Sequence, residues 1–406
     1  MKRIVICLDG TWNKVRDPAT VTNVVKIAQA VRPVASDGTH QIVYYNTGVG
    51  TGDLIDGVLG GVFGRGLRSN VQRAYAFLSL NYEPGDQIFI FGFSRGAYTA
   101  RALAGIVGVS GILHKQEYQN FDIAWNHYRL PPAVRALLPR GAGATALGAL
   151  GHLPRELLAY AEFNERGKFH RDVPVRCVGV WDTVGSYGVP AGFGLGALSR
   201  IVTAWMLRGF HDTEIGKHIE IGLHAVALDE KRRPFAPTFW IIKRGERPAG
   251  QVEQVWFCGC HSNIGGGYAD TGLSDVSLIW MCARAAELGG LDFDRAFLKD
   301  RKHVKPSVFG LLEHSEQGWP VSWPWPYNRR VLSPNAVKVN VVWNGEDPSQ
   351  VHLNEMVHWS VLERLQKVAP EHWGGKRTYD PNNLRGLVIP PDRVAQQTDR
   401  ERDFGS

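Results

Sequence analysis

Residues 88–97 read IFIFGFSRGA, an apolar run that ends at Ser94 between Gly92 and Gly96. The run has the composition of a buried strand, and the small residues after Gly96 continue as a helical pattern to residue 107. In a nucleophile elbow, a serine occupies the strained turn between a strand and a helix, and glycines two positions away leave room for neighbouring backbone. The stretch therefore predicts a strand, a sharp turn that presents Ser94, and a helix. The alternative is an ordinary tight turn.

Similar apolar runs alternate with helical patterns along the chain. The runs span residues 4–8, 41–45, 87–92, 175–181, 220–227 and 252–257, and the helical patterns include 21–31, 66–80 and 95–107. Runs that are apolar at every position are typical of strands covered on both faces. The alternation predicts an α/β fold with a mostly parallel central sheet and helices on both faces. With the serine turn after a strand, we expect an α/β-hydrolase-like arrangement.

Two segments interrupt this alternation. One, at about 116–168, is helical with an Ala/Gly/Pro-rich middle, and the other, at about 300–328, holds tryptophans among prolines. We expect both to be insertions that form a cap over a single hydrolase domain of residues 1–365. Residues 366–406 would be a C-terminal extension, and its polar, charged end predicts fraying.

Composition excludes several classes of function. Of 406 residues, 46 are Lys or Arg and 39 are Asp or Glu, and no basic run is long enough to follow a phosphate backbone. We expect no nucleic-acid partner, while the mild basicity leaves contact with a membrane surface open. The 5 cysteines include no C-x-x-C pair, which argues against a disulfide framework or a zinc site. We expect no metal and no cofactor.

The chain shows no pattern of a targeting or membrane segment. The apolar run at 4–8 is too short for a signal peptide, and the longest uncharged apolar stretch, 102–113, is well below the roughly 20 residues of a membrane span. This predicts a cytoplasmic protein, with export by a route that needs no signal peptide as the alternative.

A nucleophilic serine needs a base and a carboxylate that orients the base. In this fold type they follow in the order Ser, Asp or Glu, His, at the ends of later strands. Asp182 follows the run at 175–181, and His261 follows the run at 252–257. A turn cap and a structural histidine are their alternative roles. The competing histidines are His211, His218 and His224, of which the last lies inside a predicted strand and favours the core.

The oxyanion formed by serine attack needs two backbone N–H donors. One should be the amide of Arg95, the residue after the nucleophile, and the other an amide of the turn Gly10-Thr11-Trp12, with residues 47–50 behind it. The side chains that we expect to line the substrate site are Asp9, Trp12, Thr47, Gly48, Trp323 and Trp325. The last two could form an acyl-chain wall or an interfacial anchor, or belong to a proline-stiffened loop.

Two other motifs are incomplete. Asp9-Gly10-Thr11 is reminiscent of the D-x-D-G-T motif of haloacid-dehalogenase-type phosphatases, but Cys7 stands where the first aspartate should be. Asp9 would instead brace the turn by accepting backbone N–H bonds. The glycines at 48–52 suggest a dinucleotide loop, but Asp53 replaces its last glycine and would repel a pyrophosphate. A flexible loop beside the site is the favoured interpretation.

Five ordered blocks carry a resemblance to a known family. They are Leu8 to Asn13, Gly92 to Ala97, Trp181 to Gly185, Ala225 to Arg233, and Val255 to Phe257 leading to residues 261–267. Over about residues 1–365 the chain resembles the α/β-hydrolase catalytic domain of type VI secretion phospholipase effectors and their uncharacterised relatives. The resemblance implies a Ser-Asp-His hydrolase whose triad maps onto Ser94, Asp182 and His261. For the effector branch it implies phospholipid as substrate and a secretion or immunity partner.

The sequence departs from the family pattern in one block. After the last core strand the family usually reads His-Ser-Asp, with a proline and an aliphatic residue upstream, whereas this chain has Asn263, Cys258 and Cys260. The interpretation is a metal-independent serine hydrolase that cleaves carboxylic esters, including lipid esters, through an acyl-enzyme. The alternative is a hydrolase fold kept as a catalytically weak or inert binding protein.

Overall fold

The computed structural model describes residues 1–10, 20–48, 62–137, 154–184, 215–232, 235–243, 250–315, 329, 331, 350–352, 354–371 and 375–405. Within them an eight-stranded sheet runs in the order β14-β11-β9-β7-β6-β3-β1-β2. Its strands are β1 (Arg3–Leu8), β2 (Gln41–Asn46), β3 (Gln87–Phe93), β6 (Cys177–Trp181), β7 (Ile221–Ala227), β9 (Gln251–Phe257), β11 (Glu355–His358) and β14 (Val394–Ala395). Every neighbouring pair is parallel, which confirms the predicted sheet.

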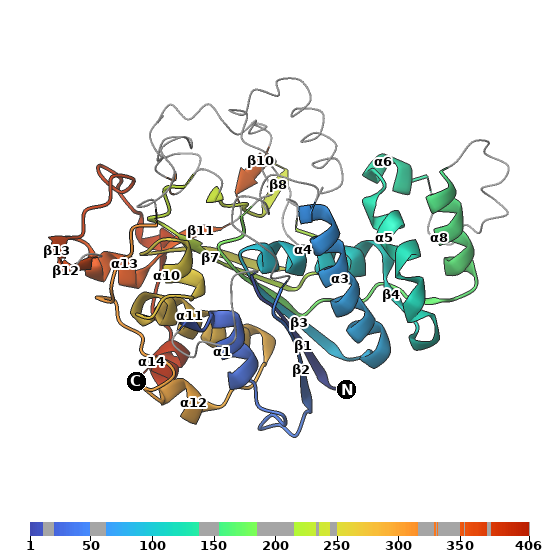
Figure 1. Ribbon diagram of the computed structural model, residues 1–406, viewed down its shortest axis with the longest axis horizontal. Coiled ribbons are helices and arrows are strands. Elements are labelled where there is room, and N and C mark those ends of the chain that lie inside the picture. The colour runs from blue at the N-terminus through green and yellow to red at the C-terminus, as the bar shows by residue number, and fades with distance from the viewer. Residues whose placement is uncertain are drawn as a thin grey trace.

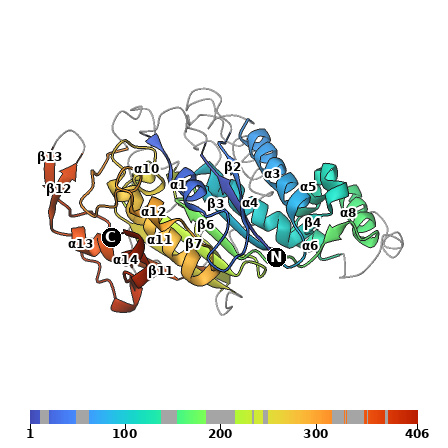
Figure 2. The same ribbon diagram turned by 90° about the horizontal axis from the view of Figure 1, so that it is seen from below.

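Helices cover both faces of the sheet (Figures 1 and 2). One face carries α3 (Val62–Asn81), α4 (Arg95–Ser110) and α5 (Phe121–Arg129), and the other carries α1 (Asn23–Ala30), α11 (Gly272–Gly289) and α12 (Arg295–Lys299). Successive side chains of a strand point to opposite faces. In β1, Ile4 and Ile6 accordingly enter the core under α3 and α4, whereas Val5 and Cys7 enter the core under α1 and α11. This is why the run at residues 4–8 is apolar at every position.

Smaller elements complete the described chain. They are β4 (Ile112–Leu113), η2 (Lys115–Asn120), α6 (Pro132–Arg135), α8 (Arg155–Glu165), β5 (Phe169–His170), β8 (Ile241–Lys243), α10 (His261–Gly265), β10 (Gln350–His352), α13 (Trp359–Arg364), β12 (Val368–Glu371), β13 (Gly375–Thr378), η5 (Pro391–Arg393) and α14 (Asp399–Gly405). Each helix among the described residues is either too short or too polar to cross a bilayer.

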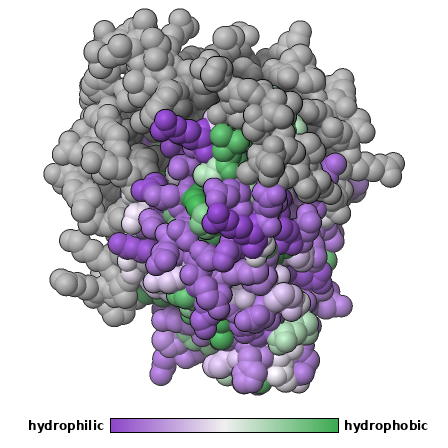
Figure 3. All heavy atoms as spheres, turned by 90° about the vertical axis from the view of Figure 1, so that its right-hand side faces the viewer, coloured by the Kyte–Doolittle hydropathy of each residue, from purple (hydrophilic) through white to green (hydrophobic). Residues whose placement is uncertain are grey.

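The predicted insertion at 116–168 lies on the face of the sheet that carries α3 and α4. Its helix α5 packs against α4 and α8, and Trp125 and Tyr160 enter the same core as Ile4 and Ile6. On the side of the molecule that carries α5, α6 and α8, the surface of the described residues is mostly hydrophilic and is broken by small apolar groups (Figure 3). The middle of this segment, and residues 316–328 of the other insertion, lie outside the described residues. The domain boundaries and the cap remain predictions.

The C-terminal end, which the sequence predicts to fray, packs against the central sheet and its helices among the described residues. The strand β14 extends the central sheet beside β11, and α14 packs beside α11 and α12 (Figure 1). Phe404 is buried and its ring meets Phe293 at 6.1 Å between centroids. The buried carboxylate of Glu401 accepts a hydrogen bond from the indole of Trp359 (3.2 Å). The end is mostly polar, but Phe404 and Glu401 of α14 are both buried.

Parallel strands place their carboxyl ends along one edge of the sheet. In register, Leu8 lies beside Gly92, and Phe93 lies beside Trp181. Ligands of open parallel sheets bind outside this edge. Ser94 and Asp182, which follow β3 and β6, therefore emerge next to each other, and His261 follows two strands further along the sheet.

Candidate functional site

Ser94 forms a one-residue turn between β3 and α4. Its φ and ψ are 57° and −120°, a backbone conformation that non-glycine residues rarely adopt. The flanking glycines are required by close contacts: a Cβ on Gly92 would lie 2.5 Å from the carbonyl oxygen of Gly96, and one on Gly96 would lie 2.1 Å from that of Leu8. The turn therefore presses the start of α4 onto the end of β1, and the strand, turn and helix occur where the sequence predicts them.

Asp182 and His261 form a buried pair beside this turn. The Nδ1 atom of His261, at the start of α10, lies 2.6 Å from Oδ2 of Asp182. The carboxylate also accepts the backbone N–H of Ala227 through Oδ1 (3.0 Å). Because an ionised carboxylate only accepts hydrogen bonds, the imidazole carries its proton on Nδ1. This leaves Nε2 as the nitrogen that can accept a proton.

The ring of His261 lies against the residue that precedes Ser94. Its centroid is 4.7 Å from that of Phe93, and Phe235 meets it edge-on at 4.9 Å. A Cβ on Gly265 would lie 2.1 Å from the Phe93 ring, so α10 can approach only because this position is glycine. Nε2 is buried and no hydrogen bond to it is made among the described residues. A buried nitrogen in that state is unusual and is explained if a reacting group is its partner.

Burial and neighbouring charges have opposite effects on Asp182. Burial alone would raise the pKa of its carboxyl, but the charge of Arg329 and the hydrogen bond from His261 lower it, and the net result is a pKa well below the usual range. Asp182 is therefore ionised throughout the neutral range. It also adopts a positive φ of 37°, like the neighbouring Ser94.

Arg329 is a contact of Asp182 that the sequence reasoning missed. Its Nη1 lies 2.5 Å from Oδ1 of Asp182, and its Nη2 lies 3.1 Å from Oδ2. The side chain is almost fully buried. Arg329 belongs to no motif and lies one residue beyond the predicted insertion at 300–328. The sequence around it therefore gave no signal of its contact with Asp182.

Side chains from residues 229–232 and Phe235 support the loop that carries His261. Glu230 accepts the backbone N–H of His261 through Oε2 (3.2 Å), and its other oxygen accepts Nε of Arg232 (2.8 Å). The guanidinium of Arg232 stacks 3.8 Å above the ring of Phe235, the same ring that meets His261. Burial raises the pKa of Glu230, but the bonds and charge of Arg232 lower it by more, so the carboxylate stays charged. The sequence marked residues 225–233 only as part of the family resemblance, and it gave no signal for Phe235.

Asn263 stands where the resemblance leads us to expect an aspartate, and its amide both accepts and donates hydrogen bonds. Its Oδ1 accepts the N–H groups of Cys260 (3.3 Å) and Glu313 (3.1 Å), and its Nδ2 donates to the carbonyl of Leu311 (3.1 Å). An aspartate could accept but could not donate this last bond. Cys260 is buried, and burial together with the charge of Glu230 raises the pKa of its thiol to about 12. The thiol stays protonated.

The competing histidines have structural surroundings. His224 is fully buried in β7, and burial lowers its pKa to about 3. The backbone N–H of Thr183 donates to its Nε2 (3.2 Å), so this neutral ring supports the turn after Asp182. Nε2 of His218 lies 2.8 Å from the carbonyl of Ala104. His211 lies outside the described residues.

The turn after β1 lies against Ser94. A Cβ on Gly10 would be 3.6 Å from Cβ of Ser94, and one on Gly48, where φ is 72°, would be 2.9 Å from the carbonyl oxygen of Asp9. The N–H of Gly10 donates to Oδ1 of Asp9 (2.7 Å), and Oδ2 accepts the hydroxyls of Thr22 (2.7 Å) and Tyr45 (2.9 Å).

These bonds bear on two expected roles. They favour the bracing role of Asp9, and they occupy the Gly10 amide that was expected to hold an oxyanion. Thr47 is exposed beside this turn. The other expected residues, Thr11, Trp12, Trp323 and Trp325, lie outside the described residues. Within the described ranges, no three His, Cys, Asp or Glu side chains are grouped so that they could hold a metal ion.

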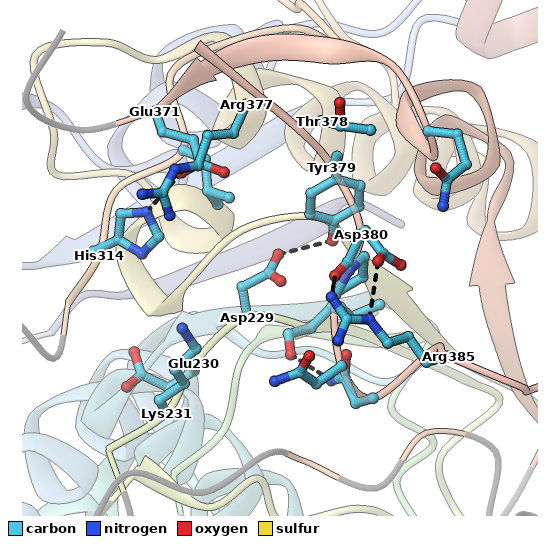
Figure 4. Close-up of a pocket in the computed structure, with 16 residues that line it drawn as sticks. Asp229, Glu230, Lys231, His314, Glu371, Arg377, Thr378, Tyr379, Asp380 and Arg385 are labelled. Atoms are coloured by element: carbon cyan, nitrogen blue, oxygen red, sulfur yellow. Dashed lines mark hydrogen bonds and ion pairs between the residues drawn. The ribbon is translucent and has the colours of Figure 1, made fainter. Parts of the chain in front are cut away.

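A polar cavity of about 480 Å³ lies beyond Glu230, between the end of β7 and the β12–β13 hairpin (Figure 4). Asp229 points into it and accepts the hydroxyl of Tyr379 (2.9 Å) as well as the N–H of Gly259 (2.7 Å). Other charged groups of its wall pair with one another, such as Arg385 with Asp380 (2.9 Å). The cavity thus adjoins the loop before His261 without including the Asp182–His261 pair.

Comparisons with known proteins include a sequence relative and two solved structures. The uncharacterized protein YEL023C of Saccharomyces cerevisiae is 29% identical over 252 residues, which are 58% of this chain and 32% of that protein. The chain therefore spans about a third of that relative's length. Among solved structures, an uncharacterized protein from Pseudomonas aeruginosa shares 16% identity at a TM-score of 0.38, with 71% of this chain and 46% of that one covered. The Vlm2 thioesterase domain bound with a dodecadepsipeptide shares 13% sequence identity at a TM-score of 0.24, with 71% of this chain and 94% of that one covered.

A family model also matches. Its description is "T6SS, Phospholipase effector Tle1-like, catalytic domain", and the match covers residues 2–284. This range includes Ser94, Asp182 and His261 together with the block at 229–235, but ends before Arg329.

Proposed function

Because the chain belongs to the family of type VI secretion Tle1-like phospholipase effector catalytic domains, we propose that it hydrolyses carboxylic esters of lipids with a Ser94-Asp182-His261 triad. The family name supports lipid-ester hydrolysis as the class of chemistry. The triad, the α/β-hydrolase class of esterase and the substrate are parts of the proposal.

The observation that carries the proposal is the state of His261. Its Nδ1 is fixed on a buried, ionised carboxylate at 2.6 Å, while its Nε2 is buried without a hydrogen bond to any described residue. The ring also packs on Phe93, so it lies next to the serine turn. A histidine oriented on one side and open on the other, beside a serine on a strained turn, is the arrangement of an activated nucleophile.

In the proposed mechanism, Oγ of Ser94 attacks the acyl carbon and His261 Nε2 takes the hydroxyl proton. Collapse of the tetrahedral intermediate releases the alcohol, which receives that proton, and water then hydrolyses the acyl-enzyme by the same steps. Asp182 keeps the imidazole in the Nδ1-protonated form and stabilises its cation. The mechanism needs no metal or cofactor.

The oxyanion would be held by backbone N–H groups. The amide of Arg95 is the first of α4, and the first N–H groups of a helix have no acceptor within it. The Gly10 amide already donates to Asp9, so we propose the amide of Thr11 as the second donor. Gly10, the residue before Thr11, lies against Ser94, which supports this choice.

Labelling with a fluorophosphonate tests the triad directly. Wild type should be labelled, and Ser94→Ala and His261→Ala should not be, because both the nucleophile and its base are needed. Ser307→Ala and His303→Ala replace exposed residues and should label like wild type. Absence of labelling of folded wild type, or labelling that survives Ser94→Ala, would contradict the proposal and favour an inert binding protein.

A substrate panel then tests the class of ester. Turnover of p-nitrophenyl esters and phospholipid vesicles should fall by roughly 10⁴ to 10⁶ in Ser94→Ala. If Trp323 and Trp325 contact a membrane surface, replacing both with alanine should lower activity on vesicles more than on soluble esters. Equal losses would contradict that contact. A cytoplasmic location, export without a signal peptide, and a secretion or immunity partner are further proposals, and fractionation and co-purification address them.

A further inference from the structure

We propose that Arg329 is a positioning residue of this site, which holds the Asp182 carboxylate for His261 and sets the pH range in which His261 can act. The inference rests on the proposed function of Asp182 and His261. It concerns a contact that the family match, residues 2–284, does not reach.

The guanidinium grips the carboxylate at two points. Nη1 donates to Oδ1 at 2.5 Å and Nη2 donates to Oδ2 at 3.1 Å, the fork that makes arginine suited to carboxylates. Each of these nitrogens also donates to a backbone carbonyl: Nη1 to that of Ala227 (2.7 Å) and Nη2 to that of Phe235. The carbonyls fix the guanidinium from the end of β7 and from the residue whose ring meets His261. Asp182 therefore rests on an anchored group.

Arg329 and His261 share one oxygen of Asp182. Oδ2 accepts Nδ1 of His261 at 2.6 Å and Nη2 of Arg329 at 3.1 Å. In the usual triad the carboxylate meets the histidine without a permanent cation on the same group. Here the negative charge that would stabilise the imidazolium is already partly balanced. The pair is also buried, so water does little to screen either charge.

The other titratable groups that face this carboxylate do not replace Arg329. His224 on β7 faces it, but burial lowers the pKa of His224 to about 3, so that ring is neutral at working pH. Glu230 faces both Arg329 and His261, and its charge is balanced by Arg232. Arg329 is therefore the fixed cation on Asp182 among the described residues.

The sign of the effect follows. Without Arg329 the charge of Asp182 acts on the imidazolium alone, so His261 holds its proton to higher pH. The buried carboxyl, without its cation, also ionises less readily at low pH. Both changes move the acid limb of the kcat/KM profile to higher pH. Loss of the two-point grip separately allows Asp182 and the imidazole to turn, which lowers kcat more than it raises KM.

The test compares Arg329→Gln and Arg329→Lys with wild type. Gln removes charge and fork, and should move the acid limb up by about one pH unit and lower kcat about tenfold to a hundredfold. Lys keeps the charge but loses the fork, so the limb should stay near that of wild type while kcat falls about tenfold. The matched control is Arg364→Gln, a buried arginine that donates to the carbonyls of Val308 and Gly310 outside the site. It should lower stability without moving the limb.

A second readout does not depend on turnover. The proton on Nδ1 of His261 should give a strongly downfield NMR signal in wild type, and that signal should shift or vanish in both Arg329 variants but not in Arg364→Gln. Folded Arg329→Gln with a wild-type limb and signal would overturn the inference. If that variant does not fold, Arg329→Lys decides: wild-type kcat and signal overturn the inference, and a reduced kcat with a changed signal supports it. Turnover that survives Ser94→Ala would contradict the proposed function while the signal still tests Arg329.

Discussion

The backbone N–H of Ser94 donates to the carbonyl of Trp181, the residue before Asp182, over 3.1 Å. This bond joins the turn that presents the serine to the turn that presents the aspartate. Ser94 and Asp182 both have a positive φ, 57° and 37°, which costs free energy and persists only where the surroundings impose it. The surroundings here are the parallel strands β3 and β6, which end side by side. The two turns are therefore one structural unit.

Gly96→Ala should disrupt that unit. The new Cβ would lie 2.1 Å from the carbonyl oxygen of Leu8. The backbone of α4 fixes the Cβ and the backbone of β1 fixes the carbonyl, so neither atom can move aside cheaply. We expect a loss of more than about 4 kcal/mol of unfolding free energy, or insoluble protein. Chemical denaturation measures it, with Gly375→Ala as the control because nothing lies within 4 Å of its added Cβ. A Gly96→Ala protein as stable as the control would show that α4 can retreat from β1.

The pH dependence of kcat/KM should report protonation of His261 and not of Asp182. Asp182 is ionised well below neutral pH, so protonation of the imidazole is what should remove the base. We expect kcat/KM to fall on the acid side as the imidazole is protonated, and a flat profile down to pH 4 would contradict the assignment.

Protonation of Asp182 should appear in the pH dependence of protein stability and not in that of activity. Its folded pKa is depressed below the unfolded value of about 4, so its contribution to stability is present above that pH and is lost as the pH falls through the folded pKa. Thermal unfolding measured from pH 7 to pH 2 should therefore show a steeper loss in wild type than in Asp182→Asn. Parallel curves for the two proteins would mean that the folded protein does not depress the pKa of this carboxyl.

The sequence predicted the features that local chemistry decides. The strands are buried on both faces and therefore read as continuous apolar runs. The serine turn is visible because it needs Gly92 and Gly96 in fixed places. Asp182 and His261 were predicted at the ends of two later strands. They are in contact because parallel strands end at one edge of the sheet.

Long-range pairing left no such trace. Arg329 is separated from Asp182 by 147 positions, and no periodic pattern relates a lone arginine to a distant aspartate. The Gly10 amide was expected to be an oxyanion donor, but it donates to the side chain of Asp9. That bond depends on the rotamer of Asp9, which the sequence does not reveal. The end of the chain looked too polar to pack, yet Phe404 and Glu401 of α14 are both buried.

Phe404→Ala tests how firmly that last helix is held. The ring is buried against Phe293 in the core beneath α11, so its removal leaves a cavity as well as exposing apolar surface. We expect a loss of about 3 to 5 kcal/mol if α14 unfolds with the domain. Val388→Ala is the control, because Val388 is 85% exposed and should change stability little. A small effect of Phe404→Ala would mean that α14 frays before the rest unfolds.

Asn263→Asp restores the residue that the family usually has, and we expect it to destabilise this chain. The amide now donates to the carbonyl of Leu311 and its oxygen accepts the N–H groups of Cys260 and Glu313. An aspartate would keep the acceptor bonds but would face the Leu311 carbonyl with a negative oxygen, at a cost of about 1 to 3 kcal/mol.

The same substitution reports on the active site. Because Asn263 lies in α10 two residues after His261, loosening it should also slow fluorophosphonate labelling of Ser94. Differential scanning calorimetry and the labelling rate measure the two effects, and Asn383→Asp provides a control, since that amide also donates to a buried carbonyl, that of Leu228, but outside α10. Faster labelling of Asn263→Asp than of wild type, at unchanged stability, would contradict this expectation. It would mean that an aspartate at position 263 can make a useful contact in this chain and that the amide is not required.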